Sequence, residues 1–317
     1  MRLHQRKDET VWNAPLGFLR GGTLDYWDPY NNNAVPIHWE FERLSGPRNS
    51  SVSMCSMSGW NIVEWGYGDG FLLEPAVRIS FAEAWERLWF ERCLHDQKHF
   101  PEFRNRESTS GFAAGISESD SEIRAKRELL EHAIYLKAWT ERRGWRKYRP
   151  SGFHARYVLP AVTPPGWTIY WFEICSVSDG SVLFILAIHP TLGTLCDLTY
   201  VCDFPSAEKK MVLSIIRALH LPRPQPLREL PESAGPRDHA SFYSDPNHNE
   251  AYHFLLTMTD LPHRPVDLKG ADLISARLLC EAGDFPAISV ASHPDWPELR
   301  WGLQAITGEN PWPHPLA

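Results

Sequence analysis

Two short segments of this chain each place a pair of glutamates three residues apart. Glu83 and Glu86 form the first pair, and Glu128 and Glu131 form the second, which His132 follows directly. Because positions i and i+3 share one face of a helix, each pair can direct both carboxylates to one point. Mg²⁺ takes about six oxygen ligands and shares them among carboxylates, water and nucleotide phosphates. The two pairs therefore indicate a magnesium site and ATP chemistry.

A purely structural interpretation of the same residues stays open. Glu-x-x-Glu is common on solvated helix faces, although like charges at this spacing cost roughly a few tenths of a kcal/mol. Ser80 followed by Glu83 also has the spacing of a capping box, which would begin a helix at Ser80. Spacing alone does not decide between a capping role and a ligand-binding role.

The elements that would position these residues follow from hydrophobic periodicity. Residues 1–60 are rich in Gly, Asn, Pro and Ser, which favours short strands and loops. The stretch 110–115 reads as a small-residue turn, either a tight connection or a place where backbone amides approach a phosphate. We expect helices over residues 80–96, from 117–121 to 143, over 206–220 and over 272–281, and strands over 157–161, 168–175, 182–188 and 287–291.

Composition excludes several classes of protein. The 317 residues are 43% hydrophobic, which supports a globular protein with a substantial core. A net charge of -7 offers no positive surface for nucleic acid, and no apolar run is long enough for a signal peptide or a membrane span. We therefore expect a cytoplasmic protein without nucleic-acid or membrane partners. The six cysteines lack a C-x-x-C pair, and no P-loop or Gly-x-Gly-x-x-Gly motif opens a helix, so ATP would bind without a Walker motif.

The first glutamate pair lies in a longer motif that resembles the signature of the YcaO family, ATP-using enzymes that modify peptide backbones. Ser80, Glu83, Glu86 and Arg87 match its Ser-x-x-Glu-x-x-Glu-Arg pattern at every named position. Upstream, residues 66–68 (Gly-Tyr-Gly) resemble the glycine-containing lead-in to that helix. The resemblance is close over residues 60–145 and elsewhere rests on the order of elements. It implies an α+β, YcaO-like fold in which mixed or antiparallel sheets pack with helices around a non-Walker ATP site.

The same resemblance implies a domain organisation and a set of functional residues. Residues 1–60 would form a loop- and strand-rich segment, and 61–317 a catalytic domain with a Pro-rich tail over 309–317. The resemblance assigns magnesium to the four glutamates of the two pairs, and nucleotide contacts to these glutamates with Ser80, Arg87 and His132. The tail resembles the Pro-x-Pro-x-Pro terminus of the azoline-forming subgroup, which implies catalytic or positioning roles for Pro311, Pro313, Pro315 and Ala317.

The implied activity is ATP- and Mg²⁺-dependent cyclodehydration of Cys, Ser or Thr in a ribosomal precursor peptide, which gives thiazoline or oxazoline rings. A leader-binding protein is the expected partner, and a flavin-dependent dehydrogenase that oxidises azoline to azole is a further one. Three helix positions depart from the family pattern: Leu213, Arg217 and His220. Either the third nucleotide contact has moved, to Glu208 or Asp203, or the chain is a divergent scaffold. A YcaO enzyme that forms a thioamide or an amidine is the remaining alternative.

Overall fold

The computed structural model describes residues 21–44, 51–104, 106–177, 180–231, 234–258, 264–296 and 312–315. The chain forms two compact units. Unit 1 comprises Met1–Glu128 and Ile274–Ser292, and unit 2 comprises Leu129–Leu273 and His293–Ala317, so that the division falls within the long helix α2 (Glu118–Glu141). The boundary predicted after residue 60 divides the chain differently and stays a prediction.

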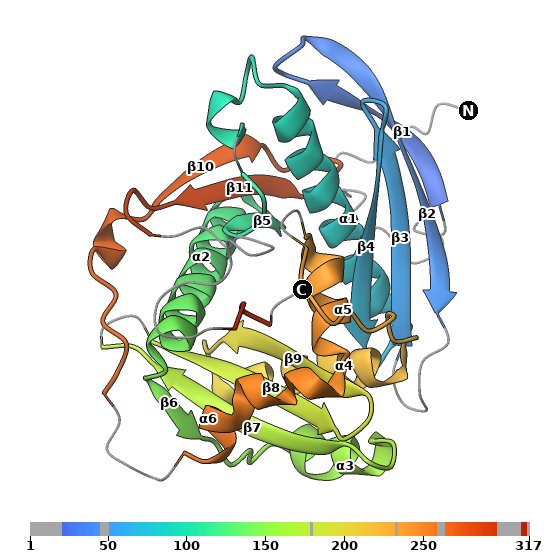
Figure 1. The fold of residues 1–317 in the computed structure, drawn as a ribbon. Coiled ribbons are helices and arrows are strands. Elements are labelled where there is room, and N and C mark those ends of the chain that lie inside the picture. Colours follow the sequence, from blue (N-terminus) through green and yellow to red (C-terminus); the bar gives the residue numbers. More distant parts are fainter. Residues whose placement is uncertain are drawn as a thin grey trace. The chain divides into compact units, whose positions relative to one another are not determined.

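Unit 1 contains two antiparallel sheets and the helix α1 (Leu73–His95). In the first sheet the strands follow chain order, and α1 lies against β3 and β4 (Figure 1). The second sheet has the order β10-β11-β5. The strands are β1 (Gly21–Asp28), β2 (Asn33–Leu44), β3 (Ser51–Gly59), β4 (Ile62–Gly70), β5 (Phe112–Gly115), β10 (Ser275–Cys280) and β11 (Ala287–Ser292), with a 3₁₀ turn, η2, at Pro101–Phe103.

The strands of unit 1 confirm two expectations and contradict two others. Residues 21–44 and 51–59 form strands and turns, and 287–291 form β11. The stretch 110–115 was predicted as a turn, but residues 112–115 pair with β11. The predicted helix over 272–281 is instead a 3₁₀ turn, η5 (Ala271–Leu273), followed by β10. Antiparallel pairing with β11 outweighs the weak helical periodicity of that segment.

The helix α1 begins well before Ser80, so the predicted capping box is wrong. Leu72 is the N-cap residue and makes no side-chain cap. Ser80 lies inside the helix, fully buried, and its hydroxyl donates to the Val77 carbonyl at 2.9 Å and contacts Ser53 Oγ at 3.2 Å. The segment that carries Glu83 and Glu86 is therefore the middle of a long helix.

Glycines on β4 allow α1 to approach this closely. A Cβ at Gly66 would lie 2.2 Å from the Ser80 carbonyl oxygen, and a Cβ at Gly68 would lie 1.9 Å from that of Ala76. Alternate residues of a strand share one face, so these glycines form a flat strip beneath the helix. The Gly-Tyr-Gly lead-in thus sets the position of α1.

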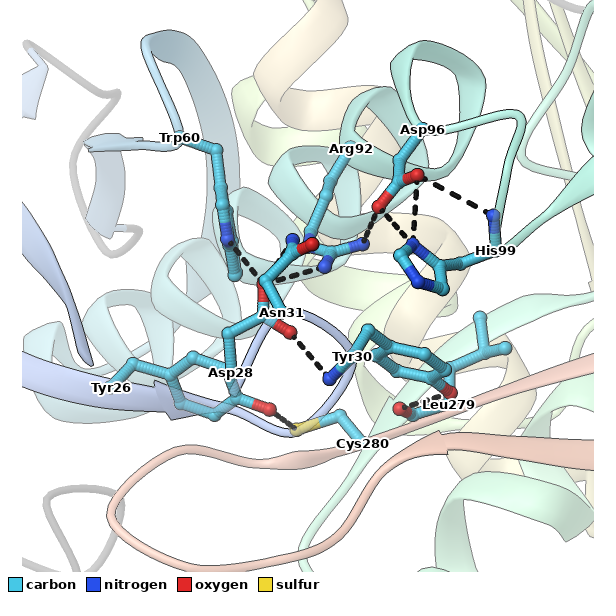
Figure 2. A network of polar contacts seen from close by, with 10 residues as sticks. All are labelled: Tyr26, Asp28, Tyr30, Asn31, Trp60, Arg92, Asp96, His99, Leu279 and Cys280. Carbon is cyan, nitrogen blue, oxygen red and sulfur yellow. Dashed lines mark hydrogen bonds and ion pairs between the residues drawn. The ribbon is translucent and has the colours of Figure 1, made fainter. Parts of the chain in front are cut away.

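A buried ion pair lies in the aromatic core of unit 1 (Figure 2). Arg92 on α1 contacts Asp28 at 2.5 Å, and their side chains are 3% and 0% exposed. The Trp60 indole and the Tyr30 amide also donate to Asp28, each at 3.0 Å. Burial alone would raise the pKa of Asp28, but the hydrogen bond from Arg92 and these two donors lower it below its usual value.

Unit 2 is built around an antiparallel sheet with the order β6-β7-β8-β9 (Figure 1). The predicted strands over 168–175 and 182–188 are confirmed, as are the predicted helix over 206–220 and α2, which spans both units. The elements are β6 (Trp145–Lys147), η3 (His154–Val158), α3 (Leu159–Val162), β7 (Thr168–Cys175), β8 (Ser181–His189), β9 (Gly193–Tyr200), α4 (Phe204–His220), α5 (Pro236–Tyr243), η4 (Pro246–Tyr252) and α6 (His253–Leu256).

The strand predicted over 157–161 is wrong, because that stretch is helical in η3 and α3. Pro160 lies in the first turn of α3, where its fixed φ suits a helix and where its missing N–H costs no ladder bond. Within the described residues, helices pack with antiparallel sheets, which confirms the predicted α+β class. None of the helices in the described part of the chain is both long and apolar enough to cross a membrane.

Candidate functional site

The first group of predicted site residues lies on α1. Arg87 contacts Glu83 Oε1 at 2.6 Å, and the Tyr67 amide of β4 donates to Glu83 Oε2 at 2.9 Å. The side chains of Arg87 and Glu83 are 42% and 29% exposed, so both can still reach a ligand. Helix and strand together hold the Glu83 carboxylate in one orientation.

Glu86 is held in a different environment. The Ala114 amide of β5 donates to Glu86 Oε2 at 2.9 Å. The 110–115 stretch, predicted as a turn whose amides could approach a phosphate, thus offers a backbone amide to this carboxylate. Burial raises the pKa of Glu86 to about 7; the Ala114 bond and the charge of Arg124 lower it, and Glu83 raises it. At neutral pH this carboxyl still holds its proton part of the time.

The second group lies on α2 at the division between the units: Glu128 is the last residue of the first segment of unit 1, and Glu131 and His132 belong to unit 2. The Tyr200 amide at the end of β9 donates to Glu131 Oε2 at 2.5 Å. Burial raises the pKa of Glu131 to about 7, while the positive charge of Lys210 lowers it and the negative charge of Asp197 raises it. Glu131 therefore matches Glu86: each is a half-buried glutamate with one backbone donor and a pKa near neutrality.

Sequence reasoning missed Lys210 on α4. The family pattern places its basic residue on this helix at the position of Leu213, further along. Lys210 Nζ donates to Thr199 Oγ1 at 3.0 Å, and its charge acts on Glu131. In the sequence, nothing in the spacing of Lys210 distinguished it from its neighbour Lys209.

His132, predicted as a nucleotide contact, is neutral at physiological pH. Burial, together with the nearby positive charge of Lys210, lowers the pKa of His132 to about 4. A neutral imidazole can still donate one hydrogen bond. The positive charge of this region therefore comes from Lys210.

The two residues suggested as replacements for the third nucleotide contact have structural partners. Glu208 is 1% exposed and accepts hydrogen bonds from the Tyr148 hydroxyl and from the Ser151 and Gly152 amides, at 2.6, 3.0 and 2.6 Å. Asp203 is the N-cap of α4 and accepts from the Ser206 amide at 2.8 Å. Both carboxylates stabilise local structure.

The remaining predicted residues fall in several places. Glu128 lies one turn before Glu131 on α2. Pro313 and Pro315 are buried in unit 2, whereas Pro311 and Ala317 lie outside the described residues. The described part of the chain contains no group of three or more His, Cys, Asp or Glu that could hold a metal ion by itself.

A cavity of about 320 Å³ opens at the C-terminal end of α1, away from the predicted residues. Arg92, Asp96 and His99 line it together with Trp60 (Figure 2). Arg92 is neutralised by Asp28, and His99 Nδ1 lies 2.9 Å from Asp96. None of the predicted site residues lines this cavity, so it adds no residue to the candidate site.

Comparison with solved structures identifies the fold. No protein-family model matches this sequence, and no curated protein is similar to it by sequence. YcaO from Methanopyrus kandleri, bound with AMPPCP and Mg²⁺, matches with a TM-score of 0.55 and 10% identity, over 80% of this chain and 84% of that one. A chain of the E. coli microcin synthetase McbBCD complex matches with a TM-score of 0.57 and 10% identity, over 82% and 88%.

A third structure, a heterocyclase in complex with substrate and cofactor, matches with a TM-score of 0.58 and 10% identity, over 82% of this chain and 50% of that one. At this identity the likeness concerns the fold. The chain therefore has the fold of YcaO proteins and cyclodehydratases, which confirms the fold that the α1 motif predicted.

Proposed function

We propose that this chain is an ATP-dependent cyclodehydratase that acts on the backbone of a ribosomal precursor peptide. The YcaO fold supports the proposal, and α1 carries the Ser-x-x-Glu-x-x-Glu-Arg motif within it. The observation on which the proposal depends is that burial raises the pKa of both Glu86 and Glu131 to about 7. A carboxyl whose pKa lies near 7 in the absence of a cation gains from a metal ion that displaces its proton.

Within this proposal the residues of the two helices bind magnesium and nucleotide. Glu83, Glu86, Glu128 and Glu131 are the proposed magnesium ligands, and Arg87 and Lys210 neutralise phosphate charge. His132 can donate one hydrogen bond, and Ser80, whose hydroxyl is buried, can act on nucleotide only through the position of α1. Mg²⁺ and ATP would supply an activated phosphoryl group with its negative charge reduced.

The proposed reaction takes place on the peptide. A Cys, Ser or Thr side chain loses its thiol or hydroxyl proton and adds to the preceding amide carbonyl carbon. The resulting oxygen attacks the γ-phosphorus of ATP and releases ADP. Phosphate then leaves, the amide nitrogen loses its proton, and an azoline ring remains. Water would leave poorly from the same adduct, whereas phosphate is a good leaving group. Pro311, Pro313, Pro315 and Ala317 are proposed to position the reacting groups.

The test is a reconstituted reaction with precursor peptide, a leader-binding partner protein and Mg-ATP. We expect the peptide to lose one water per ring at Cys, Ser or Thr, with ADP and phosphate as products. Glu86→Gln should abolish this loss, whereas Glu74→Gln on an exposed part of α1 should not. A folded protein that binds Mg-ATP and leaves peptide mass unchanged would contradict the proposal. A flavin-dependent dehydrogenase, added afterwards, would convert azoline to azole.

A second candidate is a non-catalytic scaffold that keeps the fold and binds a peptide or a sister enzyme. The positions of Leu213, Arg217 and His220 favour it, because the His220 ring contacts the Val162 carbonyl at 3.1 Å and offers no evident nucleotide contact. Calorimetric titration separates the two candidates. Magnesium-dependent ATP binding supports the enzyme, and its absence supports the scaffold. A thioamide-forming enzyme would instead bind ATP and exchange an amide oxygen for sulfur. An amidine-forming enzyme would lose the same water with an amine as the nucleophile, so fragmentation of the product must place the modification at Cys, Ser or Thr.

A further inference from the structure

Four successive main-chain carbonyls, those of residues 312–315, each accept a hydrogen bond from a side chain of unit 2. The four donors lie on α2, α5 and β9, and we call them the donor row. The indole of Trp139 donates to Trp312 O (3.1 Å), the hydroxyl of Tyr243 to Pro313 O, Nδ1 of His239 to His314 O (2.9 Å) and the thiol of Cys196 to Pro315 O (3.5 Å).

The composition of this segment is complementary to the donor row. Pro313 and Pro315 have no N–H, so half of the segment's backbone positions offer only an acceptor. The prolines also fix φ, which keeps the segment extended and lowers the entropy lost when it is bound. The backbone of residues 312–315 thus has a carbonyl acceptor at every position but an N–H donor only at every second one, which suits a row of side-chain donors.

The segment is also packed against the row. Pro313, His314 and Pro315 are buried, and His314 is 1% exposed, with its ring 5.0 Å from that of His239. The Trp312 ring packs near Phe242 at 6.3 Å. The contact therefore includes side chains as well as hydrogen bonds.

The protein holds the donor row itself in place. His239 and Tyr243 lie one turn apart on α5 and so point to the same side. Gly193, at φ +73°, begins β9 and lets α5 approach, because a Cβ there would lie 2.3 Å from the Tyr243 carbonyl oxygen. Thr194 Oγ1 donates to that same oxygen at 3.3 Å. The strand that carries Cys196 therefore also fixes the end of α5.

We infer that the donor row is a recognition site for a segment with proline at alternate positions, and that its occupant is residues 312–315 of this chain. Trp139, His239 and Tyr243 are then positioning residues. How the bound segment acts in catalysis rests on the proposed function, whereas the recognition does not.

The thiol of Cys196 gives a direct measurement on the full-length chain. It bonds to the segment, so alkylation by iodoacetamide, mapped by mass spectrometry, reports how often the segment detaches. Tyr243→Phe removes a single hydroxyl, and we expect Cys196 to be labelled about five- to tenfold faster. Tyr148→Phe is the matched control, because that hydroxyl donates to Glu208, also in unit 2, and does not touch the segment. It should leave the Cys196 rate unchanged.

Two further substitution pairs test recognition separately from folding. Pro313→Ala adds an N–H and frees φ, and should speed labelling about two- to fivefold. His239→Asn keeps a donor near Nδ1 and should label more slowly than His239→Leu. Labelling of Tyr243→Phe and Pro313→Ala at the wild-type rate, or equal acceleration by Tyr148→Phe, would overturn the inference. Peptide cyclisation does not enter this measurement, so its failure leaves the inference intact; if cyclisation occurs, Tyr243→Phe should lower kcat and leave the KM for ATP unchanged.

Discussion

Glu86 and Glu131 reach similar pKa values through similar surroundings. Each is largely enclosed by protein, accepts one backbone hydrogen bond, and lies near one acidic and at least one basic side chain. Burial favours the protonated form of a carboxyl, and one backbone bond is too few to offset it. Such a group stays responsive to pH and to any cation that approaches, which suits a transiently occupied metal site.

This state of Glu86 predicts how Glu86→Gln changes stability with pH. Below pH 4.5 the carboxyl is protonated in the folded and unfolded chains, so it has no effect. Between 4.5 and about 7 the unfolded chain has lost the proton that the folded chain keeps, so the stability of the wild type falls as pH rises. Without magnesium, we expect Glu86→Gln to be more stable than wild type at pH 8 by on the order of 1 kcal/mol, since partial exposure reduces the effect.

The measurement is urea unfolding at pH 4 and at pH 8. The two proteins should have equal stability at pH 4. Glu74→Gln, which replaces a half-exposed carboxylate on the same helix, serves as the control and should show no such pH-dependent gain. Equal stabilities of wild type and Glu86→Gln at pH 8 would contradict the raised pKa.

The Arg92–Asp28 pair predicts a large cost for removing one partner. Arg92→Leu leaves the Asp28 carboxylate buried without its counter-ion, and should reduce the free energy of unfolding by about 3–5 kcal/mol. The exposed Arg78–Glu74 pair on the same helix is the control, and Arg78→Leu should cost no more than about 1 kcal/mol. Replacing Asp28 by Asn as well should recover part of the Arg92→Leu loss. Equal costs at both arginines would show that burial of this pair is unimportant.

At the scale of elements, hydrophobic periodicity correctly predicted the helices and strands whose structure depends on their own sequence. The strands over 168–175 and 182–188 and the helix over 206–220 have strong apolar periodicity, and they formed where expected. The start of α1 was missed, although Glu74 and Pro75 are typical of a first helical turn. The segment that became β10 was misread because its structure depends on pairing with β11, which periodicity does not contain.

Some residues of the candidate site were likewise predictable from the sequence, and others were not. The motif on α1 identified Glu83, Glu86 and Arg87 because their spacing is the signal. Lys210 has no such signal, since its relation to Glu131 depends on how α4 packs on β9. The sequence also could not predict that the backbone amides of Tyr67, Ala114 and Tyr200 donate to the glutamates, because every residue type except proline has such an amide.

The glycines of β4 give a prediction for the contact between this strand and α1. In Gly68→Ala the new Cβ would meet the backbone of α1 at Ala76 and Ser80, neither of which can rotate away. We expect a loss of about 1–3 kcal/mol in the free energy of unfolding and, because α1 must shift, weaker nucleotide binding. Gly283→Ala in the same unit meets nothing within 4 Å and should be neutral to within about 0.5 kcal/mol. If Gly68→Ala folds with unchanged stability, the close approach of strand and helix is not needed.

At the scale of the whole molecule, each unit has its own hydrophobic core. One core gathers the aromatic residues of α1 with the first sheet, and the other gathers the C-terminal part of α2 with the second unit's sheet and Trp312. The predicted magnesium ligands belong to both units: Glu86 lies in unit 1 and Glu131 in unit 2. The proposed function requires that one bound nucleotide draw on both.

This requirement gives a test by thermal unfolding with and without Mg-ATP. A ligand present at a hundred times its dissociation constant stabilises the folded state by about 2.7 kcal/mol, which raises the Tm of the wild type measurably. Glu86→Gln and Glu131→Gln should each remove most of that rise. Because both carboxylates would serve one metal ion, the double variant should bind little worse than either single variant. Glu74→Gln should keep the full rise. A rise that survives either single substitution would show that nucleotide does not engage both units, and the enzymatic proposal would then fail.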